Sequence, residues 1–297
     1  MPIPLLHFPL LVLDEVIKNM KLQQLFRLSL CSKRMHWVVK NLRDKSIELE
    51  MKLVGFGDGK TDMIECSLTE KNSGRDFLLF SITPVSEGQL EIWRVDKFGG
   101  GVFHEEKILF YQGVLFKNGK SGFRSYWADI EEGTRCIVEH ICELFGVQVN
   151  KVSIHGDHLW IFDLVEELQG TRSYDANAWC EQLTDDQLRH LLVDLNPTSL
   201  LLGDAPSEQF RIESLRKTYD ELTLSGGHWV TGENLLTLDC SRLSIRRKMF
   251  TADEINRFLR HVLVDGGAPR LTEFRVCVKH SNANRILKGV PMSFKIS

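Results

Sequence analysis

Four short stretches of the sequence carry residue types that could do chemistry. The first, GFGDGKT at 55–61, suggests a phosphate-binding loop. That motif needs a glycine, four further residues and then Gly-Lys-Thr. Counting back from Gly59 puts the required glycine at position 54, which is Val54. The flanking segments have the composition of strands on both sides, so we expect a hairpin turn here.

The second stretch is HGDH at 155–158, where two histidines lie beside an aspartate. Histidine and carboxylate side chains bind zinc, but no second pair of ligands stands at a matching spacing. We therefore expect surface-loop histidines. The third comprises two carboxylate pairs, Glu166-Glu167 and Asp185-Asp186, which we interpret as charges at helix ends or on solvated faces.

The fourth stretch is the basic cluster SRLSIRRK at 241–248. We expect a solvated turn, and contact with an acidic partner is the alternative. The sequence has neither a Gly-x-Ser-x-Gly elbow nor a glycine-rich dinucleotide fingerprint. We therefore expect no catalytic constellation, no metal site and no cofactor.

Composition excludes several further classes of protein. The chain has 297 residues, a formal net charge of -3 and 26% charged residues, so no positive field would attract nucleic acid or an anionic membrane. No segment approaches eighteen uninterrupted apolar residues, and Asp14 and Glu15 interrupt the first apolar run, which argues against a membrane span and a signal peptide. The seven scattered cysteines predict reduced, mostly buried thiols in an intracellular protein, cytoplasmic or nuclear.

The spacing of apolar residues predicts the helices and strands that would position these candidate residues. The stretch FPLLVLDEVIKNM, at 8–20, predicts a helix with Pro9 in its first turn and one apolar side formed by Leu10, Leu13, Val16, Ile17 and Met20. A second helix is predicted from Leu22 to about Cys31, and a third over 31–42 with Ser32 as its cap. So small a module cannot bury all of its apolar surface. The surplus faces either the rest of the chain, as a helical cap, or another protein.

Residues 46 to about 130 contain short β-branched and aromatic runs between glycine-rich turns, which predict a β-meander. From residue 131 strands alternate with amphipathic helices, predicted at 131–146, 158–168, 184–195 and 251–267. Strands are expected at 149–156, 198–204, 219–227, 234–245 and 270–278. This rhythm suggests a leucine-rich-repeat-like stack, with a compact α/β sandwich as the alternative.

The N-terminal run resembles an F-box over roughly residues 5 to 42. Phe8-Pro9 stands for the usual Leu-Pro, and the apolar positions of the first two helices match without a gap. Cys31-Ser32-Lys33-Arg34 provides the small residue, serine and basic pair that follow. One departure is Met35, where an aromatic residue is expected; Trp37 comes two residues later.

The C-terminal part resembles the type 2 F-box-associated domain of nematode F-box proteins. The resemblance rests on LLTLDCSRLSI at 235–245, on the Asn256-Arg257-Phe258-Leu259 helix and on the Pro269-Arg270-Leu271 strand. The order, with the F-box first, supports both matches.

The residue patterns and the resemblances together predict an α+β protein with a small three-helix F-box at 1–45, a β-meander at 46–130 and an α/β leucine-rich-repeat-like domain at 131–297. The resemblances themselves imply the non-catalytic substrate adaptor of a Skp1-cullin-F-box ubiquitin ligase. Binding to a Skp1-type adaptor, and through it to a cullin, is expected at Pro9, Leu10, Leu13, Val16, Ile17, Leu25 and Leu28. The C-terminal domain would bind an unidentified protein substrate. A scaffold without a ligase and an enzyme with a cryptic site are the alternatives.

Overall fold

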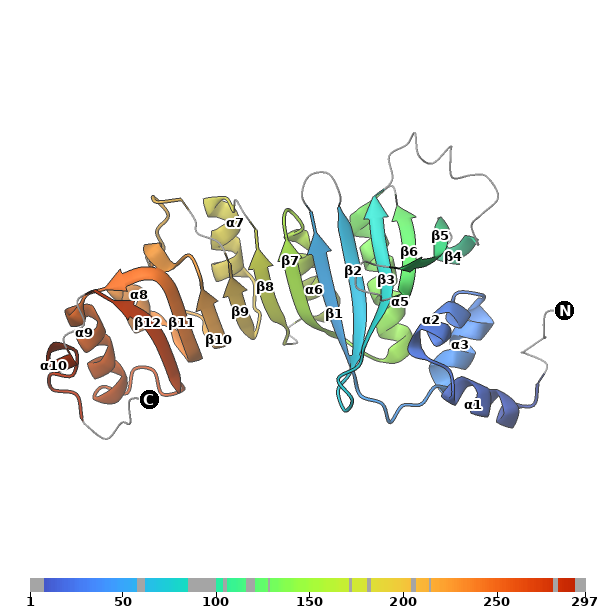
Figure 1. The fold of residues 1–297 in the computed structure, drawn as a ribbon, viewed down its shortest axis with the longest axis horizontal. Helices are drawn as coiled ribbons and strands as arrows, with labels where there is room; N and C mark the ends of the chain where they lie inside the picture. Colours follow the sequence, from blue (N-terminus) through green and yellow to red (C-terminus); the bar gives the residue numbers. More distant parts are fainter. Residues whose placement is uncertain are drawn as a thin grey trace. The chain divides into compact units, whose positions relative to one another are not determined.

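The computed structural model forms two compact units, Met1–Gly170 and Thr171–Ser297, each considered by itself below (Figure 1). Both units combine helices and strands, which confirms the predicted α+β class. The structure describes residues 8–57, 62–84, 100–103, 106–115, 121–127, 129–170, 173–180, 183–203, 207–213, 215–279 and 283–291.

Three short helices begin the first unit, as the spacing predicted: α1 (Leu10–Lys18), α2 (Leu22–Ser29) and α3 (Lys33–Leu42). The side chain of Ser32 caps α3 by accepting a hydrogen bond from the backbone N–H of Met35, at 3.1 Å. This cap satisfies one of the N–H groups that a helix leaves unpaired at its start.

A mixed sheet follows, in the order β7-β1-β2-β3-β6-β5-β4. The strands β1 (Leu49–Phe56), β2 (Met63–Glu70) and β3 (Asp76–Pro84) are consecutive and antiparallel. The strands β4 (Gly100–Phe103), β5 (Glu106–Leu115) and β6 (Ser121–Trp127) form a second antiparallel group. The parallel strand β7 (Val149–His155) joins the sheet beside β1.

The prediction of one continuous meander is wrong at the junction of the two groups, because β6 lies parallel to β3. Alternation of polar and apolar residues determines which face a side chain takes, but it carries no information on strand direction. The predicted strand run at 89–95 lies outside the described residues.

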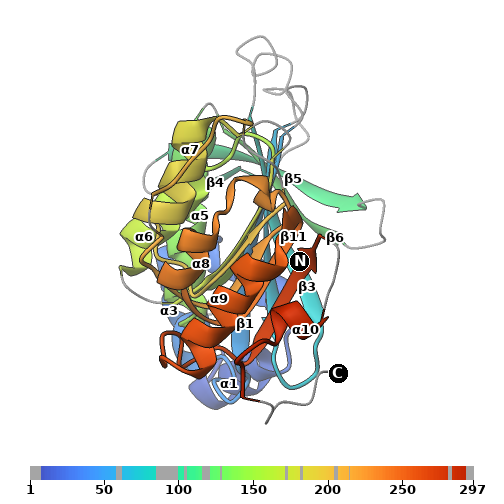
Figure 2. The ribbon, with the colours of Figure 1, turned by 90° about the vertical axis from the view of Figure 1, so that its left-hand side faces the viewer.

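Two helices, α5 (Ile130–Phe145) and α6 (Trp160–Gln169), lie on one side of β1 and β3 (Figure 2). Asp129 caps α5 by accepting from the N–H groups of Glu131 and Glu132, and Gly146 ends it in the left-handed conformation, with φ at 59°. The buried face of α2 packs against β3 and α5. Its Phe26 is fully buried, with its ring 5.5 Å from that of Phe80 and 5.7 Å from that of His140.

The second unit is a parallel sheet whose strands are neighbours in chain order: β8 (Asp175–Trp179), β9 (Ser199–Leu202), β10 (Thr218–Leu224), β11 (Asp239–Phe250) and β12 (Glu273–Val278). Their connections include α7 (Asp185–Arg189) with a π-helical turn (His190–Asp194), η3 (Gly227–Trp229), α8 (Gly232–Thr237) and α9 (Ala252–Leu263). A short helix, α10 (Ala283–Ile286), follows β12. Figure 2 shows α7, α8 and α9 on the same side of β11.

Two local predictions in this unit were wrong. The strand expected over 234–245 begins only at Asp239, because Thr231 and Asn234 form a capping box that starts α8. Strand β8 was missed, since Asp-Ala-Asn-Ala-Trp has no β-branched residue and gains its place from pairing with β9. The sequence predicted a boundary between the β-rich segment and the C-terminal domain at residue 130. This position is the start of α5, inside the first compact unit, and the functional boundary stays a prediction.

Replacing Phe26 by alanine is expected to lower the free energy of unfolding of the first unit by about 3–5 kcal/mol. The substitution opens a cavity between α2, β3 and α5, at a side chain with no exposed surface. Urea denaturation followed by circular dichroism would measure the loss. The control is Lys33→Ala at an exposed position, expected to change stability by less than about 0.5 kcal/mol. Equal stability of the two variants would contradict the packing described.

Candidate functional site

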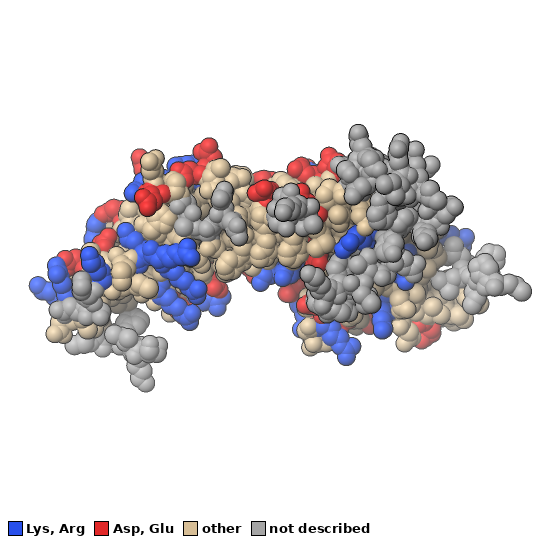
Figure 3. Space-filling model, turned by 45° about the horizontal axis from the view of Figure 1, so that its top comes forward, with Lys and Arg blue, Asp and Glu red and all other residues tan. Residues whose placement is uncertain are grey.

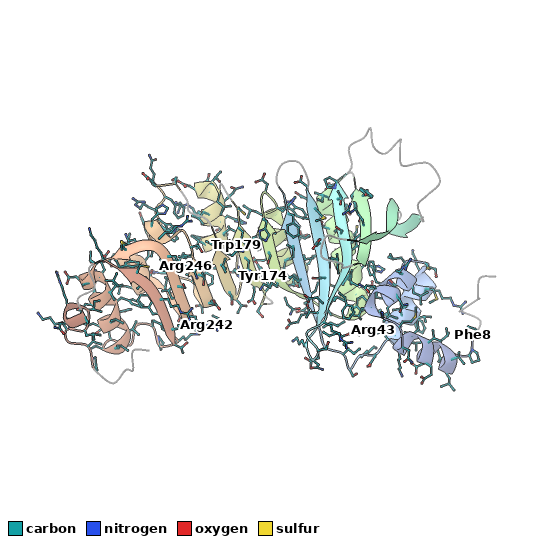
Figure 4. The ribbon with its side chains drawn as sticks, in the orientation of Figure 1. Phe8, Arg43, Tyr174, Trp179, Arg242 and Arg246 are labelled. Atoms are coloured by element: carbon teal, nitrogen blue, oxygen red, sulfur yellow. The ribbon has the colours of Figure 1, made fainter. Side chains whose placement is uncertain are left out.

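The outer side of α1 carries a cluster of exposed apolar side chains. Phe8 is 40% exposed, Leu10 63%, Leu11 81% and Val12 43%, and Pro9 between them is also exposed. Figure 4 shows Phe8 at the edge of the N-terminal helices. Four large apolar residues in five consecutive positions make a continuous patch, which we call the α1 patch (Phe8–Val12). Such a patch marks an interaction site more often than scattered apolar residues do.

The inner side of the same helix is buried. Leu13 and Ile17 are 6% and 0% exposed on the side of α1 that packs against α3, and Leu25 of α2 is 4% exposed. The seven residues predicted to bind the adaptor therefore have different environments. Pro9 and Leu10 lie in the α1 patch, Val16 and Leu28 are half-buried, and Leu13, Ile17 and Leu25 belong to the core.

Sequence reasoning missed Leu11, Val12 and Trp37, which is 60% exposed on α3. The signal for α1 was present, since PLLVL places apolar residues on all sides of the first turn, whereas a helix with one buried face shows a single stripe. Trp37 stands two residues after Met35, which fills the core position where the family has an aromatic residue, at 5% exposure.

Polar contacts join the N-terminal helices to α5. The Ser29 hydroxyl lies 2.8 Å from Nε2 of His140, and Lys40 Nζ lies 2.7 Å from a carboxylate oxygen of Glu143. The hydrogen bond from Lys40 holds the pKa of Glu143 below its usual value. These contacts fix the position of the helices against α5, and no described residue of the unit buries the α1 patch.

Arg43, labelled in Figure 4, makes the most extensive of these contacts. Its Nε donates to the carbonyl of Leu144 at 3.1 Å, and Nη2 donates to the carbonyl of Phe145. The guanidinium also lies over the Phe145 ring, with Cζ 5.8 Å from its centroid. Burial lowers the pKa of Arg43 from its ordinary value because desolvation penalises the charged form. A cation at the C-terminus of α5 also interacts favourably with the helix dipole.

The remaining candidates have structural roles. The stretch at 55–61 joins the antiparallel strands β1 and β2, as a hairpin requires, although 58–61 lie outside the described residues. The prediction of two surface histidines at 155–158 is wrong for His158, which is 5% exposed with Nε2 3.0 Å from the carbonyl oxygen of Phe56. His155 is exposed and stacks on Phe56. The turn needs Gly156, whose φ is 101° and whose added Cβ would lie 2.1 Å from the Gly57 carbonyl oxygen.

The carboxylate pairs and the cysteines show no arrangement for catalysis. Asp185 and Asp186 lie in the first turn of α7, and Glu167 forms a bidentate pair with Arg135. All seven cysteines are free; four are buried, one is half-buried and two are exposed. Burial raises the pKa of the Cys142 thiol to about 11 and that of Cys240 to about 12, which keeps both protonated. Within the described ranges, no three His, Cys, Asp or Glu residues form a cluster that could hold a metal.

The comparisons with known proteins agree with the N-terminal geometry. Residues 5–46 match the family model described as F-box domain, and residues 212–276 match the one described as F-box associated. The chain carries an F-box followed by an F-box-associated domain. This order confirms the resemblance to nematode F-box proteins and implies a Skp1-binding adaptor of a ubiquitin ligase, a class of proteins that are generally not catalytic.

A curated relative is similar to nearly the whole chain. It is the Skn-1 dependent zygotic transcript 15 protein of Caenorhabditis elegans, 24% identical over 303 residues, which cover 97% of this chain and 83% of the relative. No solved structure matches the chain. Among the helices that the structure describes, none has the length and apolar character needed to cross a membrane.

Within this frame, α1, α2 and α3 are the F-box helices, and the α1 patch is their exposed apolar surface. The F-box-associated match covers β10, β11 and β12 with the helices between them. Arg43 lies three residues before the end of the F-box match and joins the F-box helices to α5 of the same unit.

Replacing Arg43 by alanine is expected to lower the free energy of unfolding by about 1–2 kcal/mol, since it removes two hydrogen bonds from a charged donor to the end of α5. Arg43→Lys keeps the charge but not the planar fork, so it should recover only part of the loss. Chemical denaturation would measure both, with the exposed Lys45→Ala as a control. If Arg43→Ala and Lys45→Ala were equally stable, the hydrogen bonds of Arg43 to α5 would not contribute to stability.

Proposed function

We propose that this chain is the substrate-recognition adaptor of a Skp1-cullin-F-box type ubiquitin ligase. The F-box would bind a Skp1-type adaptor and, through it, a cullin, while the C-terminal domain would bind a target protein. The observation that carries the proposal is the α1 patch. It leaves large apolar side chains exposed on a helix whose other side is already buried.

The adaptor-binding surface we propose is narrower than the seven residues that the sequence suggested. Pro9 and Leu10 are accessible to a partner, together with Phe8, Leu11 and Val12. Leu13, Ile17 and Leu25 would act indirectly by holding α1 and α2 in place, because buried side chains are unavailable to a partner. Val16 and Leu28, which are half-buried, would lie at the border of the interface.

The C-terminal unit supports a role in holding a target. Its parallel strands, neighbours in chain order with helices on one side, support the further proposal of a leucine-rich-repeat-like stack. The functional division we propose is an F-box at 1–45, a β-rich segment at 46–130 and a recognition domain at 131–297. A bound target would be ubiquitinated because it is held near a charged enzyme supplied by the complex, which raises its effective concentration.

This role needs no cofactor from the chain and places it inside the cell, in the cytoplasm or the nucleus. It involves neither nucleic acid nor a membrane. A protein-interaction scaffold without a ligase would show the same fold but would not bind the adaptor.

Leu11→Asp is expected to weaken binding to a Skp1-type adaptor by at least tenfold. Burying one leucine contributes about 1.5–3 kcal/mol, and the substitution also places an unpaired charge in an apolar interface. Leu11 is 81% exposed, so the variant should keep the thermal stability of the wild type. Isothermal titration calorimetry with the purified adaptor would measure the change.

The matched control is Val264→Asp, which changes a 55% exposed apolar residue at the end of α9. It should bind the adaptor like the wild type. Unchanged binding by a folded Leu11→Asp variant would sink the proposed interface. Failure of the folded wild type to bind any Skp1-type adaptor would favour the scaffold.

A further inference from the structure

We propose that the open face of the C-terminal sheet, along the carboxyl ends of β8, β9 and β10 and the adjoining bulge of β11, binds an acidic extended segment of another protein. The inference rests on the proposed role of this unit in target binding, and it specifies the surface and the chemistry of the segment. The surface consists of Trp179, Ser225 and the basic bulge Arg246–Lys248.

The strand register places Trp179 and Arg246 in one row. Four residues are paired across neighbouring strands: Ala178 with Leu202, Leu202 with Leu224, and Leu224 with Ile245. Each of them is at most 2% exposed. Side chains alternate between the faces of a strand, so the next residues point to the opposite, open face: Trp179, Gly203, Ser225 and Arg246. Three strand spacings of about 4.8 Å separate Trp179 from Arg246, a span of roughly 14 Å that an extended peptide of about five residues would cover.

Trp179 provides an apolar platform at one end of this row. Its side chain is 44% exposed, and its ring lies against Gly203, where an added Cβ would come within 2.2 Å of the ring. Between the indole and Arg246 the row carries only Gly203 and the small side chain of Ser225. A large exposed indole beside small residues is typical of a contact surface.

The other end of the row is a basic bulge in β11. Ile245 pairs with Val276 and Met249 with Cys277, so Arg246, Arg247 and Lys248 have no partner on β12. Arg247 has a φ of 56°, in the left-handed region, and no other non-glycine residue in the described part of the chain has a positive φ. Strain of this kind costs free energy and occurs preferentially at binding sites.

Charge complementarity identifies the partner. Neighbouring arginines are neutralised: Arg242 pairs with Glu221 at 2.7 Å, Arg275 with Glu273 and Arg270 with Asp220. No ion pair joins Arg246 or Arg247 to any residue that the structure describes, and Lys248 lies over the ring of Phe250. Figure 3 shows a group of Lys and Arg side chains on this unit, with Asp and Glu side chains along its upper edge.

The same face favours a peptide over nucleic acid. Arg242 is already paired with Glu221, so among the described residues the face offers only the three cations of the bulge, which are few for a phosphate backbone that carries a charge on every nucleotide. Three adjacent cations beside an exposed indole fit a segment with a few carboxylates and an apolar residue. The solvated turn expected at 241–248 is wrong, because this stretch lies within β11. Contact with an acidic partner, the alternative, is what we propose for its bulge.

The test uses the full chain and two fluorescein-labelled peptides of about eight residues, rich in glutamate or glutamine and otherwise identical, each with one phenylalanine. Fluorescence anisotropy should show that the glutamate peptide binds and the glutamine peptide does not. Arg247→Gly removes one cation and also relieves the positive φ, so it should keep or raise the melting temperature. It should weaken binding of the glutamate peptide by about fivefold or more, as should Trp179→Ala. The control is Arg260→Ser, at an exposed position of α9, which should change binding by less than about twofold.

Equal binding of the two peptides, or wild-type affinity in Arg247→Gly, would overturn the inference. Binding of a phosphoserine peptide or of a single-stranded RNA without binding of the glutamate peptide would also overturn it and assign the surface to another class of ligand. Adaptor binding, measured on the same samples, separates the two proposals. If the adaptor binds and the peptide does not, only this surface is wrong; if the peptide binds and the adaptor does not, the ligase role is wrong.

Discussion

The burial of Phe26 between β3 and α5 is the contact on which the arrangement of the first unit depends. It attaches the F-box helices to the sheet, because α2 has its apolar side on Phe80 and His140. Ser29, Lys40 and Arg43 then add polar contacts to α5, which fix the position along that helix. With α2 and α3 held this way, α1 lies at the periphery with its inner side buried and its outer side exposed.

This arrangement resolves a conflict inherent in a very small helical module. Three short helices cannot bury enough apolar surface to be stable alone, yet a docking module must keep some apolar surface exposed. The strand β3 and the helix α5 bury the apolar side of α2 and so stabilise the three helices. The α1 patch can therefore stay exposed without loss of the fold. The F-box therefore packs on the chain's own core and still leaves an apolar surface exposed, as the proposed binding to an adaptor requires.

The C-terminal unit leaves a surface exposed for a different reason. Parallel strands joined by helical connections put α7, α8 and α9 on one side, and the opposite side keeps a polar face. Along that face Arg242 is paired with Glu221 on the neighbouring strand, and Arg275 is paired with Glu273 on its own strand. The bulge at Arg246–Lys248 interrupts this pairing, because three residues of β11 face no residue of β12. An irregular backbone thus turns a neutral face into one with a local positive charge.

Helices with clear caps and stripes could be predicted from the sequence alone. Ser32 and Thr251 both cap helices as expected, and the three helices of the F-box lie where the spacing put them. The family resemblance also followed from the sequence, since it depends on the order of residue types along the chain. Of the seven residues predicted to bind an adaptor, Pro9 and Leu10 are exposed, whereas Leu13, Ile17 and Leu25 are buried. The sequence could not separate them, because one apolar stripe looks the same whether the chain's own core or a partner covers it.

Tertiary structure decided what local pattern cannot encode. The parallel pairing of β3 with β6, the place of β8 beside β9 and the burial of His158 under the end of β1 all join residues far apart in sequence or depend on strand direction. The row from Trp179 to Arg246 likewise exists only because four strands align in register. The sequence by itself determined the helices with long apolar stripes and the family the chain resembles, since capping and helical spacing act over a few residues, although it placed a strand where the short α8 forms. Which apolar and basic side chains stay exposed was decided by packing, because burial depends on neighbours that only the folded chain brings together.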